Sequence, residues 1–432
     1  MPASPYDLIL GLDRSDQKAD LCLLDTRTGA RQTTVIATTP EALWEWLAEL
    51  RQQHPHARVG LCLEQPAGHL IPFLEAYAWI TLHPINPITL QKYREAFVTS
   101  RAKDDTQDAA YLADLLLNHH AQLPVWAPED SATRAVQQLV FHRRAVVDER
   151  TALTNRLQAL LKQYYPQALA LCGADLWRPL ATAFLLKWPS LGAAQKVKPA
   201  TLTQFYHRHG SRSAKLLDQR LALLEKAVPV TDETAVIGSF VLRVQLISRQ
   251  LQQLQRTLAE FDQQIAAAYA AHPDRAIFAS LPGAGPVLGP RLLASLGSQR
   301  ERFDSAANLQ HYTGIAPVTK RSGGSCRIHR RYLCPKFHRQ SFHEYAKESI
   351  LWSRWAAAFY LQQRTKGCAH HTAVRALAFK WQRVIWRCWQ NHKPYDESIY
   401  EVALRKNGSP LVTLFDRVEL GKSPWKNPAK KN

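Results

Sequence analysis

Four carboxylates in the first quarter of the 432-residue chain have residue types and positions suited to holding divalent cations. Asp13 ends the apolar run YDLILGLD, and Glu64 closes a second run, RVGLCLE. Asp105 and Asp108 are three residues apart, so on a helix they share one face. Two Mg²⁺ ions need about this many hard oxygen ligands, and such a pair favours in-line phosphoryl transfer. The pattern therefore predicts a metal-dependent site.

Each carboxylate also has a structural interpretation. Asp104 can cap the following helix, with Gln107 completing a capping box. Asp105 would then be an acidic first-turn residue favoured by the helix dipole. Asp13 is the hardest to explain structurally, because a charge at the end of a buried strand needs a partner. A solvated acidic face is the alternative to a metal site.

An α/β layered domain with a mixed sheet would position these residues. Apolar alternation predicts strands over residues 6–13, 19–25, 31–38, 58–65 and 80–83. Helical spacing predicts helices over residues 40–52, 68–79, 89–97 and 105–118, with a turn at 84–87. Functional groups gather at strand ends in such sheets, and two of the four carboxylates follow strands.

Charge is divided unevenly along the chain. Residues 1–125 carry 10 Lys/Arg and 15 Asp/Glu, a net of −5, whereas the rest carry 45 and 21, a net of +24. A polyanion partner such as nucleic acid explains the basic part. Carboxylates in a protein that binds phosphates indicate metal ions between the two.

The remainder of the chain is predicted to be mostly helical. Residues 126–128 are expected to form a linker, and residues 237–265 carry a heptad pattern typical of a coiled coil. A weaker heptad over 136–161 could pair with it within one chain or across a dimer. We expect domains over 1–125, 126–275 (oligomerisation) and 276–400, followed by an extension with a basic tail over 401–432.

The N-terminus lacks the features of a signal peptide, and no apolar run approaches the ~18 residues of a membrane helix, so a cytoplasmic location is expected. Seven scattered cysteines argue against a disulfide framework. Cys326, His329, Cys334 and His338 have ligand types that suit zinc, but their spacing is cramped, and we favour no metal there.

Residues 318–342 form the most basic segment, with no Asp or Glu. Its cationic residues are Lys320, Arg321, Arg327, Arg330, Arg331, Lys336 and Arg339. Aromatic residues interleave with them, a combination that suits contact with a nucleic-acid backbone and base stacking. A solvated basic face is the alternative.

Several motifs together resemble one known family. ILGLD, CLEQPAG and KDDTQDA are similar to the acidic motifs of the DEDD transposases of bridge-RNA-guided insertion sequences, and SLPGAG, HYTGIAP and RSGG are similar to that family's second domain. The resemblance implies an RNase H-like N-terminal domain of the Holliday-junction-resolvase type, a coiled-coil middle and a mainly α-helical C-terminal transposase domain. It places the catalytic and Mg²⁺-binding carboxylates on Asp13, Glu64, Asp105 and Asp108.

The resemblance also implies a catalytic serine, which falls on Ser322. That serine would attack DNA and form a covalent phosphoserine link during excision and insertion of a mobile element. DNA, a guide (bridge) RNA and a dimer or tetramer are the implied partners, with Ser322 acting in its own or a neighbouring protomer. A junction-resolving nuclease that uses water, or a non-catalytic nucleic-acid-binding protein, are the rival functions.

Overall fold

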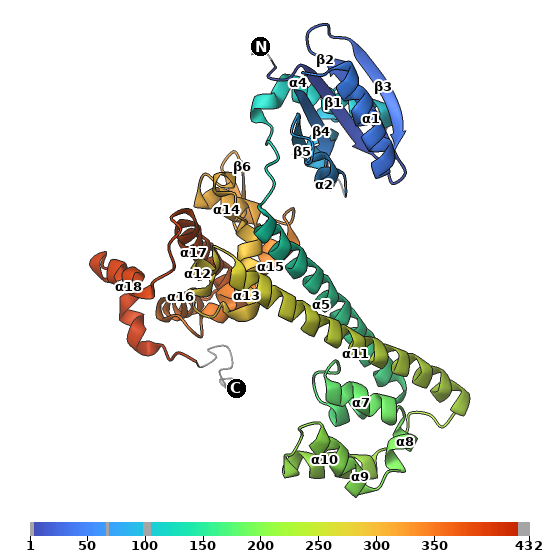
Figure 1. Cartoon of the computed structure of the whole chain (residues 1–432). Coiled ribbons are helices and arrows are strands. Elements are labelled where there is room, and N and C mark those ends of the chain that lie inside the picture. Colours follow the sequence, from blue (N-terminus) through green and yellow to red (C-terminus); the bar gives the residue numbers. More distant parts are fainter. Residues whose placement is uncertain (1–3, 66–68, 98–104, 422–432) are drawn as a thin grey trace. The chain divides into compact units, whose positions relative to one another are not determined.

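The computed structural model describes residues 4–65, 69–97 and 105–421, apart from the side chains of residues 105, 106 and 416. The chain divides into two compact units, residues 1–128 and 129–432 (Figure 1). Asp104 lies outside the described residues, so its predicted role as a helix cap is left open.

A five-stranded mixed sheet forms the centre of the first unit. Its strands are β1 (Leu8–Arg14), β2 (Lys18–Asp25), β3 (Arg31–Ala37), β4 (Val59–Glu64) and β5 (Ile80–Ile85), in the order β3-β2-β1-β4-β5. The first three strands pair antiparallel, and β4 and β5 run parallel to β1. The predicted mixed α/β sheet is therefore confirmed.

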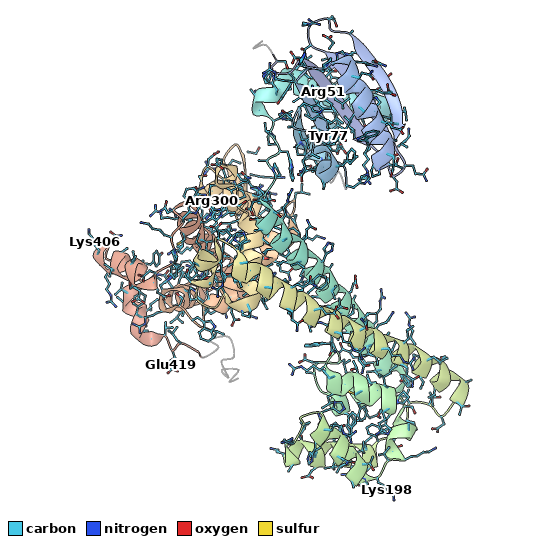
Figure 2. All side chains as sticks on the ribbon, viewed as in Figure 1. Arg51, Tyr77, Lys198, Arg300, Lys406 and Glu419 are labelled. Atoms are coloured by element: carbon cyan, nitrogen blue, oxygen red, sulfur yellow. The ribbon has the colours of Figure 1, made fainter. Side chains whose placement is uncertain are left out.

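Helices pack on both faces of this sheet. The side chains of α1 (Pro40–Gln53) and α2 (Leu70–Leu74) share a core with Leu10 and Leu12 of β1. The other face carries α3 (Pro87–Glu95) and α4 (Asp105–His119), which pack around Ile9. At the edge of the first core, the Arg51 guanidinium lies 5.1 Å from the centre of the Trp79 ring, which also contacts Tyr77 (Figure 2).

Two elements differ from the sequence-based expectation. The helix expected over 68–79 is only α2, because the backbone beyond it turns back to the sheet, where Val59 N donates to Trp79 O at 3.1 Å. The turn expected at 84–87 begins later, since β5 continues through Pro84 to Ile85. Proline is tolerated there because β5 is an edge strand of the sheet.

A glycine brings α4 against the sheet. A Cβ atom added to Gly11 of β1 would lie 1.9 Å from the Ala109 carbonyl oxygen and 2.6 Å from the Ala113 amide nitrogen, both in α4. Neither atom can rotate away, because both belong to the helix backbone. Only glycine at this position lets helix and strand approach so closely.

We expect Gly11→Ala to destabilise the protein by at least the roughly 1–3 kcal/mol typical of overpacking, because the obstructing atoms are backbone. Chemical denaturation followed by circular dichroism measures the loss. The matched control is Gly238→Ala in the second unit, where a new Cβ meets nothing within 4 Å. Equal stability of the two variants would contradict the close contact.

Two long antiparallel helices organise the second unit. They are α5 (Ser131–Tyr164) and α11 (Thr234–Ala271), which run side by side (Figure 1). The start of α5 and the end of α11 share one hydrophobic core, and their opposite ends share another. The two predicted heptad segments therefore pack against each other within one chain.

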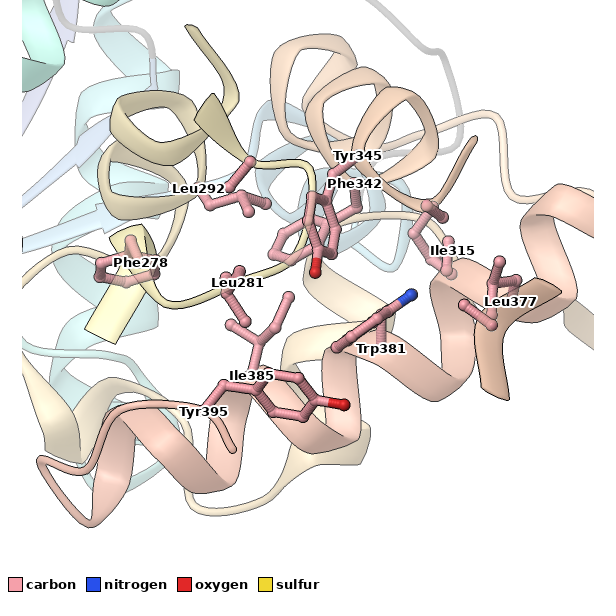
Figure 3. Packing of buried hydrophobic residues seen from close by; sticks show 14 of the residues in the cluster. Phe278, Leu281, Leu292, Ile315, Phe342, Tyr345, Leu377, Trp381, Ile385 and Tyr395 are labelled. Atoms are coloured by element: carbon pink, nitrogen blue, oxygen red, sulfur yellow. The ribbon is translucent and has the colours of Figure 1, made fainter. Parts of the chain in front are cut away.

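Shorter helices complete each of these two cores. The core at the end of α5 and the start of α11 includes α6 (Ala168–Cys172), α7 (Pro179–Lys187), α8 (Leu191–Gln195), α9 (Pro199–Arg208) and α10 (Ala214–Lys226). The other core is built by α12 (Arg275–Ala279), α13 (Gly285–Leu296), α14 (Ala306–Tyr312), α15 (Lys336–Ser349), α16 (Arg354–Thr365), α17 (His370–Gln390) and α18 (Glu397–Lys406). Its centre is Trp381, whose ring contacts Trp355 and whose Nε1 donates to Ser349 Oγ at 2.8 Å (Figure 3).

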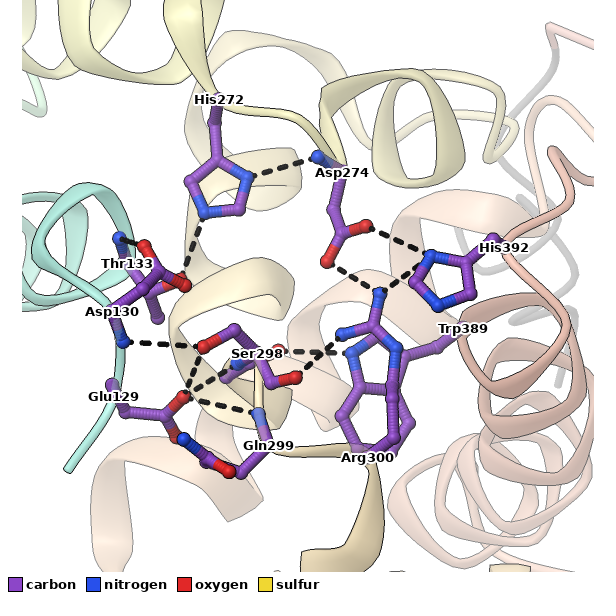
Figure 4. Close-up of polar contacts among 11 residues, drawn as sticks. Glu129, Asp130, Thr133, His272, Asp274, Ser298, Gln299, Arg300, Trp389 and His392 are labelled. Atoms are coloured by element: carbon purple, nitrogen blue, oxygen red, sulfur yellow. Dashed lines mark hydrogen bonds and ion pairs between the residues drawn. The ribbon is translucent and has the colours of Figure 1, made fainter. Parts of the chain in front are cut away.

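A partly buried carboxylate fastens the start of α5 to the core that contains α13. Glu129 accepts hydrogen bonds from Ser298 N at 2.6 Å and Gln299 N at 3.2 Å, in the turn after α13 (Figure 4). Gly297 makes room for it, with a φ of 76° and no space for a Cβ beside the carboxylate. Nearby, Asp274 pairs with Arg300 at 2.6 Å (Figure 4).

The C-terminal region was expected to be mainly helical, but a two-stranded hairpin interrupts it. The hairpin consists of β6 (Val318–Ser322) and β7 (Ser325–His329), joined by a two-glycine turn. Gly-Gly between two strands is a typical tight-hairpin connection, and Gly323 adopts a φ of 54°. All residues from Thr319 to Arg330 are exposed.

Candidate functional site: strand-end carboxylates and an exposed basic hairpin

Two of the predicted carboxylates lie side by side at the end of the sheet. Leu12 of β1 pairs with Leu63 of β4, so the next residues along these parallel strands, Asp13 and Glu64, are neighbours. Alternation from Ile9 and Gly11 places Asp13 on the face that carries α4. Both carboxylates are partly buried. The structure therefore brings Asp13 and Glu64 together.

The α4 helix supplies the other two predicted carboxylates. Asp105 is the first residue of α4, but its side chain lies outside what the structure describes. Asp108 is buried, and both of its carboxylate oxygens accept hydrogen bonds from Arg94 Nη1, at 3.0 and 2.8 Å. Arg94 belongs to α3, so this ion pair ties α3 to α4. An arginine thus neutralises one of the four carboxylates.

A fifth carboxylate, Asp20, escaped the sequence-based prediction. It lies directly opposite Asp13 in the antiparallel register of β1 and β2. Such cross-strand partners point to the same face, with Cβ atoms about 4.5–5.5 Å apart. Asp20 is buried, and its carboxylate lies 3.3 Å from Lys18 Nζ. Residues 15–18 form the turn between the strands, so a predicted hairpin register would have found this pair.

The chemistry of these donors fits a hard divalent cation. Aspartate and glutamate oxygens are the ligands that Mg²⁺ prefers. Cys62, two residues before Glu64, is not a competing soft ligand, because burial, and then the Glu64 charge, raises the pKa of its thiol to about 12. Asp108 would share its carboxylate between Arg94 and a metal ion at such a site, because each oxygen accepts only one hydrogen bond from Arg94.

We expect Arg94→Ala to destabilise the protein by roughly 3–5 kcal/mol, because it leaves the Asp108 carboxylate buried without a cation. The control is Arg31→Ala, which breaks a more exposed ion pair with Asp114 on the same helix and should cost about 1 kcal/mol or less.

Thermal unfolding in EDTA and in Mg²⁺ measures both variants. Mg²⁺ should restore more stability to Arg94→Ala than to the wild type, since a bound ion stabilises the folded state. If the two variants lost equal stability in EDTA, the Arg94–Asp108 pair would contribute no more to stability than the exposed Arg31–Asp114 pair.

The hairpin of the second unit holds the predicted serine. Ser322 is the last residue of β6 and pairs with Ser325 across the turn, so it lies at the exposed tip. Lys320 and Arg327 are opposite each other in the strand register, two residues from the tip. His329 lies at the far end of the hairpin opposite Val318, about 13 Å from Ser322 at the usual strand rise, so it cannot act as that serine's base within the hairpin.

Cationic side chains extend from the hairpin to its base. Arg321 and Arg330 are exposed, as is Lys336 at the start of α15. Arg331 is partly buried, and its carbonyl oxygen accepts from Arg339 Nη1 at 3.0 Å, so Arg339 holds the loop between β7 and α15.

Arg375 of α17 adds a cation that sequence reasoning missed, because it lies more than 30 residues downstream. Burial, followed by the charges of Arg330 and Arg339, lowers the pKa of Arg375. Positive charge is therefore concentrated at the base of the hairpin, as expected of a surface that binds phosphates.

The possible zinc ligands do not converge. Cys326 and His329 are three residues apart on β7, so their side chains leave opposite faces of the hairpin. Cys334 contacts Arg339 Nη1 at 3.2 Å, and His338 is buried against Tyr312. Within the described part of the chain, no three His, Cys, Asp or Glu side chains are grouped to hold a metal ion, and this includes the strand-end carboxylates without Asp105, whose side chain is not described.

Burial makes His338 sensitive to pH, because it lowers the pKa of the imidazole from 6.5 to about 4. Between these values the unfolded chain binds a proton that the folded protein excludes, so stability falls as the pH drops from 6.5 towards 4. The loss for a shift of this size is on the order of 3 kcal/mol.

We expect His338→Phe to weaken this pH dependence, measured as denaturation midpoints at pH 7 and pH 5. His343→Phe is a matched second variant, since burial also lowers the pKa of His343 to about 4. An unchanged difference between the two pH values in both variants would contradict the assignment.

Carboxylates at a strand end and an exposed serine on a basic hairpin are groups expected of an enzyme that acts on nucleic-acid phosphates. Two transposase families match the chain: residues 10–166 match the DEDD transposase family of IS110, and residues 275–361 match the transposase IS116/IS110/IS902 family. The two matched segments together span more than half of the chain. The protein belongs to this family of DEDD transposases, which are DNA-acting enzymes.

Curated relatives support this assignment. The chain is 29% identical over 395 residues to a Streptomyces coelicolor protein named as the mini-circle transposase for IS117, covering 90% of this chain and 95% of that one. It is 28% identical over 286 residues to a 43.6 kDa protein of insertion element IS110 from the same species, covering 64% and 68%. It is 26% identical over 305 residues to a 42 kDa protein of IS900 from Mycobacterium paratuberculosis, covering 68% and 73%.

None of the helices among the described residues combines the length and apolar character needed to span a membrane.

Proposed function

We propose that this transposase excises and inserts a mobile element by DNA strand exchange, with Ser322 as the nucleophile and Mg²⁺ at the strand-end carboxylates. The observation that carries the proposal is the position of Ser322 at the exposed tip of a basic hairpin. A serine that served only the turn would not need to lie within a 25-residue segment with seven cations and no acid.

The first unit supports the metal-binding half of the proposal. Its strand order, with three antiparallel strands followed by two parallel ones, is the arrangement expected of an RNase H-like fold. Asp13, Glu64, Asp105 and Asp108 would hold the metal. Mg²⁺ bound there would offset negative charge on a phosphate and make a hydroxyl nucleophile more acidic.

The second unit supplies the nucleophile. In the first step the Ser322 oxygen attacks the phosphorus of a DNA phosphodiester, and the bond from phosphorus to one deoxyribose oxygen breaks. The serine proton passes to a base, and the released deoxyribose oxygen takes up a proton. The product is a phosphoserine ester. In the second step a hydroxyl oxygen of another DNA end attacks this phosphorus, the bond from phosphorus to the Ser322 oxygen breaks, and the serine oxygen takes back a proton. A serine hydroxyl needs activation for this attack, and no histidine of the hairpin lies close enough to give it.

Variants of the two serines at the hairpin tip test the nucleophile. We expect Ser322→Ala to abolish a covalent protein–DNA adduct on radiolabelled substrate, whereas Ser325→Ala, directly opposite in the register, should retain it. Asp13→Ala should lose strand cleavage while still binding DNA.

The rival function, a nuclease that uses water, predicts that Ser322→Ala cleaves normally and that no adduct forms with the wild type. An adduct lost only in Ser325→Ala would move the nucleophile by three residues. DNA binding without cleavage by the wild-type protein would favour a non-catalytic binding protein.

The proposal includes a guide RNA and a homo-oligomer. The +24 net charge of residues 126–432 supports binding of a second polyanion besides DNA, and pairing between RNA and DNA would then choose the target sequence. Within this part of the chain we assign residues 126–275 to oligomerisation, 276–400 to the domain of Ser322 and 401–432 to a C-terminal extension. Sequencing RNA that copurifies with the protein tests the guide, and recovery of no specific RNA would count against it.

A further inference from the structure

The register of the β6–β7 hairpin sorts its side chains onto two faces. Residues directly opposite each other project to the same side, and alternate residues along a strand share a face. Ser322 and Ser325 therefore share one face with the pair Lys320 and Arg327. Arg321 leaves from the other face, although it precedes Ser322 in sequence.

On the face of the hairpin that carries Ser322, the two cations lie closer to the serine than the histidine does. Lys320 and Arg327 lie two residues from the tip, about 7 Å along the strand at the usual rise. Their side chains extend several ångströms, so an ammonium and a guanidinium can both meet a phosphate held at Ser322. His329, on the same face, is about twice as far away.

Lys320 and Arg327 are free to move to a ligand. Both side chains are exposed, and Gly323 and Gly324 leave open space at the tip, where an added Cβ would meet nothing within 4 Å. A phosphate group can therefore approach the backbone of the turn directly. The two chemistries complement each other, since guanidinium binds two phosphate oxygens at once and ammonium acts as a point charge.

We propose that Lys320 and Arg327 bind the non-bridging oxygens of the phosphate that Ser322 attacks, and that Arg321 binds DNA elsewhere. This inference rests on the proposed function of Ser322. Negative charge builds up on the non-bridging oxygens as the Ser322 oxygen bonds to phosphorus, and the two cations on its face stabilise that charge. Lys320 and Arg327 therefore act in the bond-forming step, whereas Arg321 contributes only to affinity.

The test measures adduct formation in a single turnover with the full-length protein and a radiolabelled DNA substrate of the element end. Lys320→Ala, Arg327→Ala and Arg321→Ala are compared at saturating DNA, with dissociation constants determined separately over a salt series. Arg327→Lys tests rescue by a conservative change. Thermal unfolding confirms that each variant is folded, which is expected because all three side chains are exposed.

We expect Lys320→Ala and Arg327→Ala to slow adduct formation at saturating DNA by roughly 10²-fold, the effect of removing one transition-state donor. Arg327→Lys should recover part of this rate. Arg321→Ala should act on affinity: it should raise the dissociation constant, lower the salt slope by about one, and slow adduct formation at saturating DNA less than Lys320→Ala and Arg327→Ala do.

Two results would overturn the inference while leaving the nucleophile intact: equal slowing by Arg321→Ala, or effects of Lys320→Ala and Arg327→Ala on affinity alone. If the wild type forms no adduct, or if Ser322→Ala still forms it, the proposed function itself is wrong and the inference falls with it.

Discussion

The backbone contact between Gly11 of β1 and Ala109 of α4 is the constraint on which the acidic half of this enzyme depends. It packs the first turns of α4 directly against β1, two residues before Asp13, which lies beside Glu64. The glycine is therefore required by the close packing of α4 on β1 rather than by a turn, since it lies within a regular strand.

Concentrated negative charge at this sheet end needs compensation when no cation is bound. Arg94 provides it for Asp108, and Lys18 lies 3.3 Å from the carboxylate of Asp20. Loss of one partner should destabilise the protein more at the buried Arg94–Asp108 pair than at the Lys18–Asp20 pair, because it leaves a desolvated charge. The Asp108 carboxylate has about four lone-pair sites, so it could accept from Arg94 and still bind a metal ion. The arginine would then share this side chain with the metal rather than exclude it.

Much of the first unit follows from local patterns in the sequence. Apolar runs predicted all five strands, and the ends of β1 and β4 located Asp13 and Glu64. Asp20 and Arg94 were missed because their importance depends on pairing across strands and helices, which a single sequence does not specify. The pairing of the two long helices was left open for the same reason: a heptad pattern shows which face is apolar but not which chain covers it.

The hairpin was missed for a different physical reason. A Gly-Gly pair is a recognised turn signal, but the flanking residues lack the apolar alternation that marks a half-buried strand. Both faces of the hairpin are exposed, so its residues need not alternate between apolar and polar types. Polar residues on both faces make sense if the hairpin's role is to present side chains to a partner rather than to a core.

This exposure bears on the proposed role of Ser322 as a nucleophile. An isolated two-stranded ribbon is marginally stable, and Ser322 on it has no base within the hairpin, so the hydroxyl is unreactive by itself. If Ser322 is the nucleophile, as proposed, its activation has to come from groups outside the hairpin. The division of charge along the chain matches this logic, because the acidic unit suits metal ions and the basic unit suits phosphates.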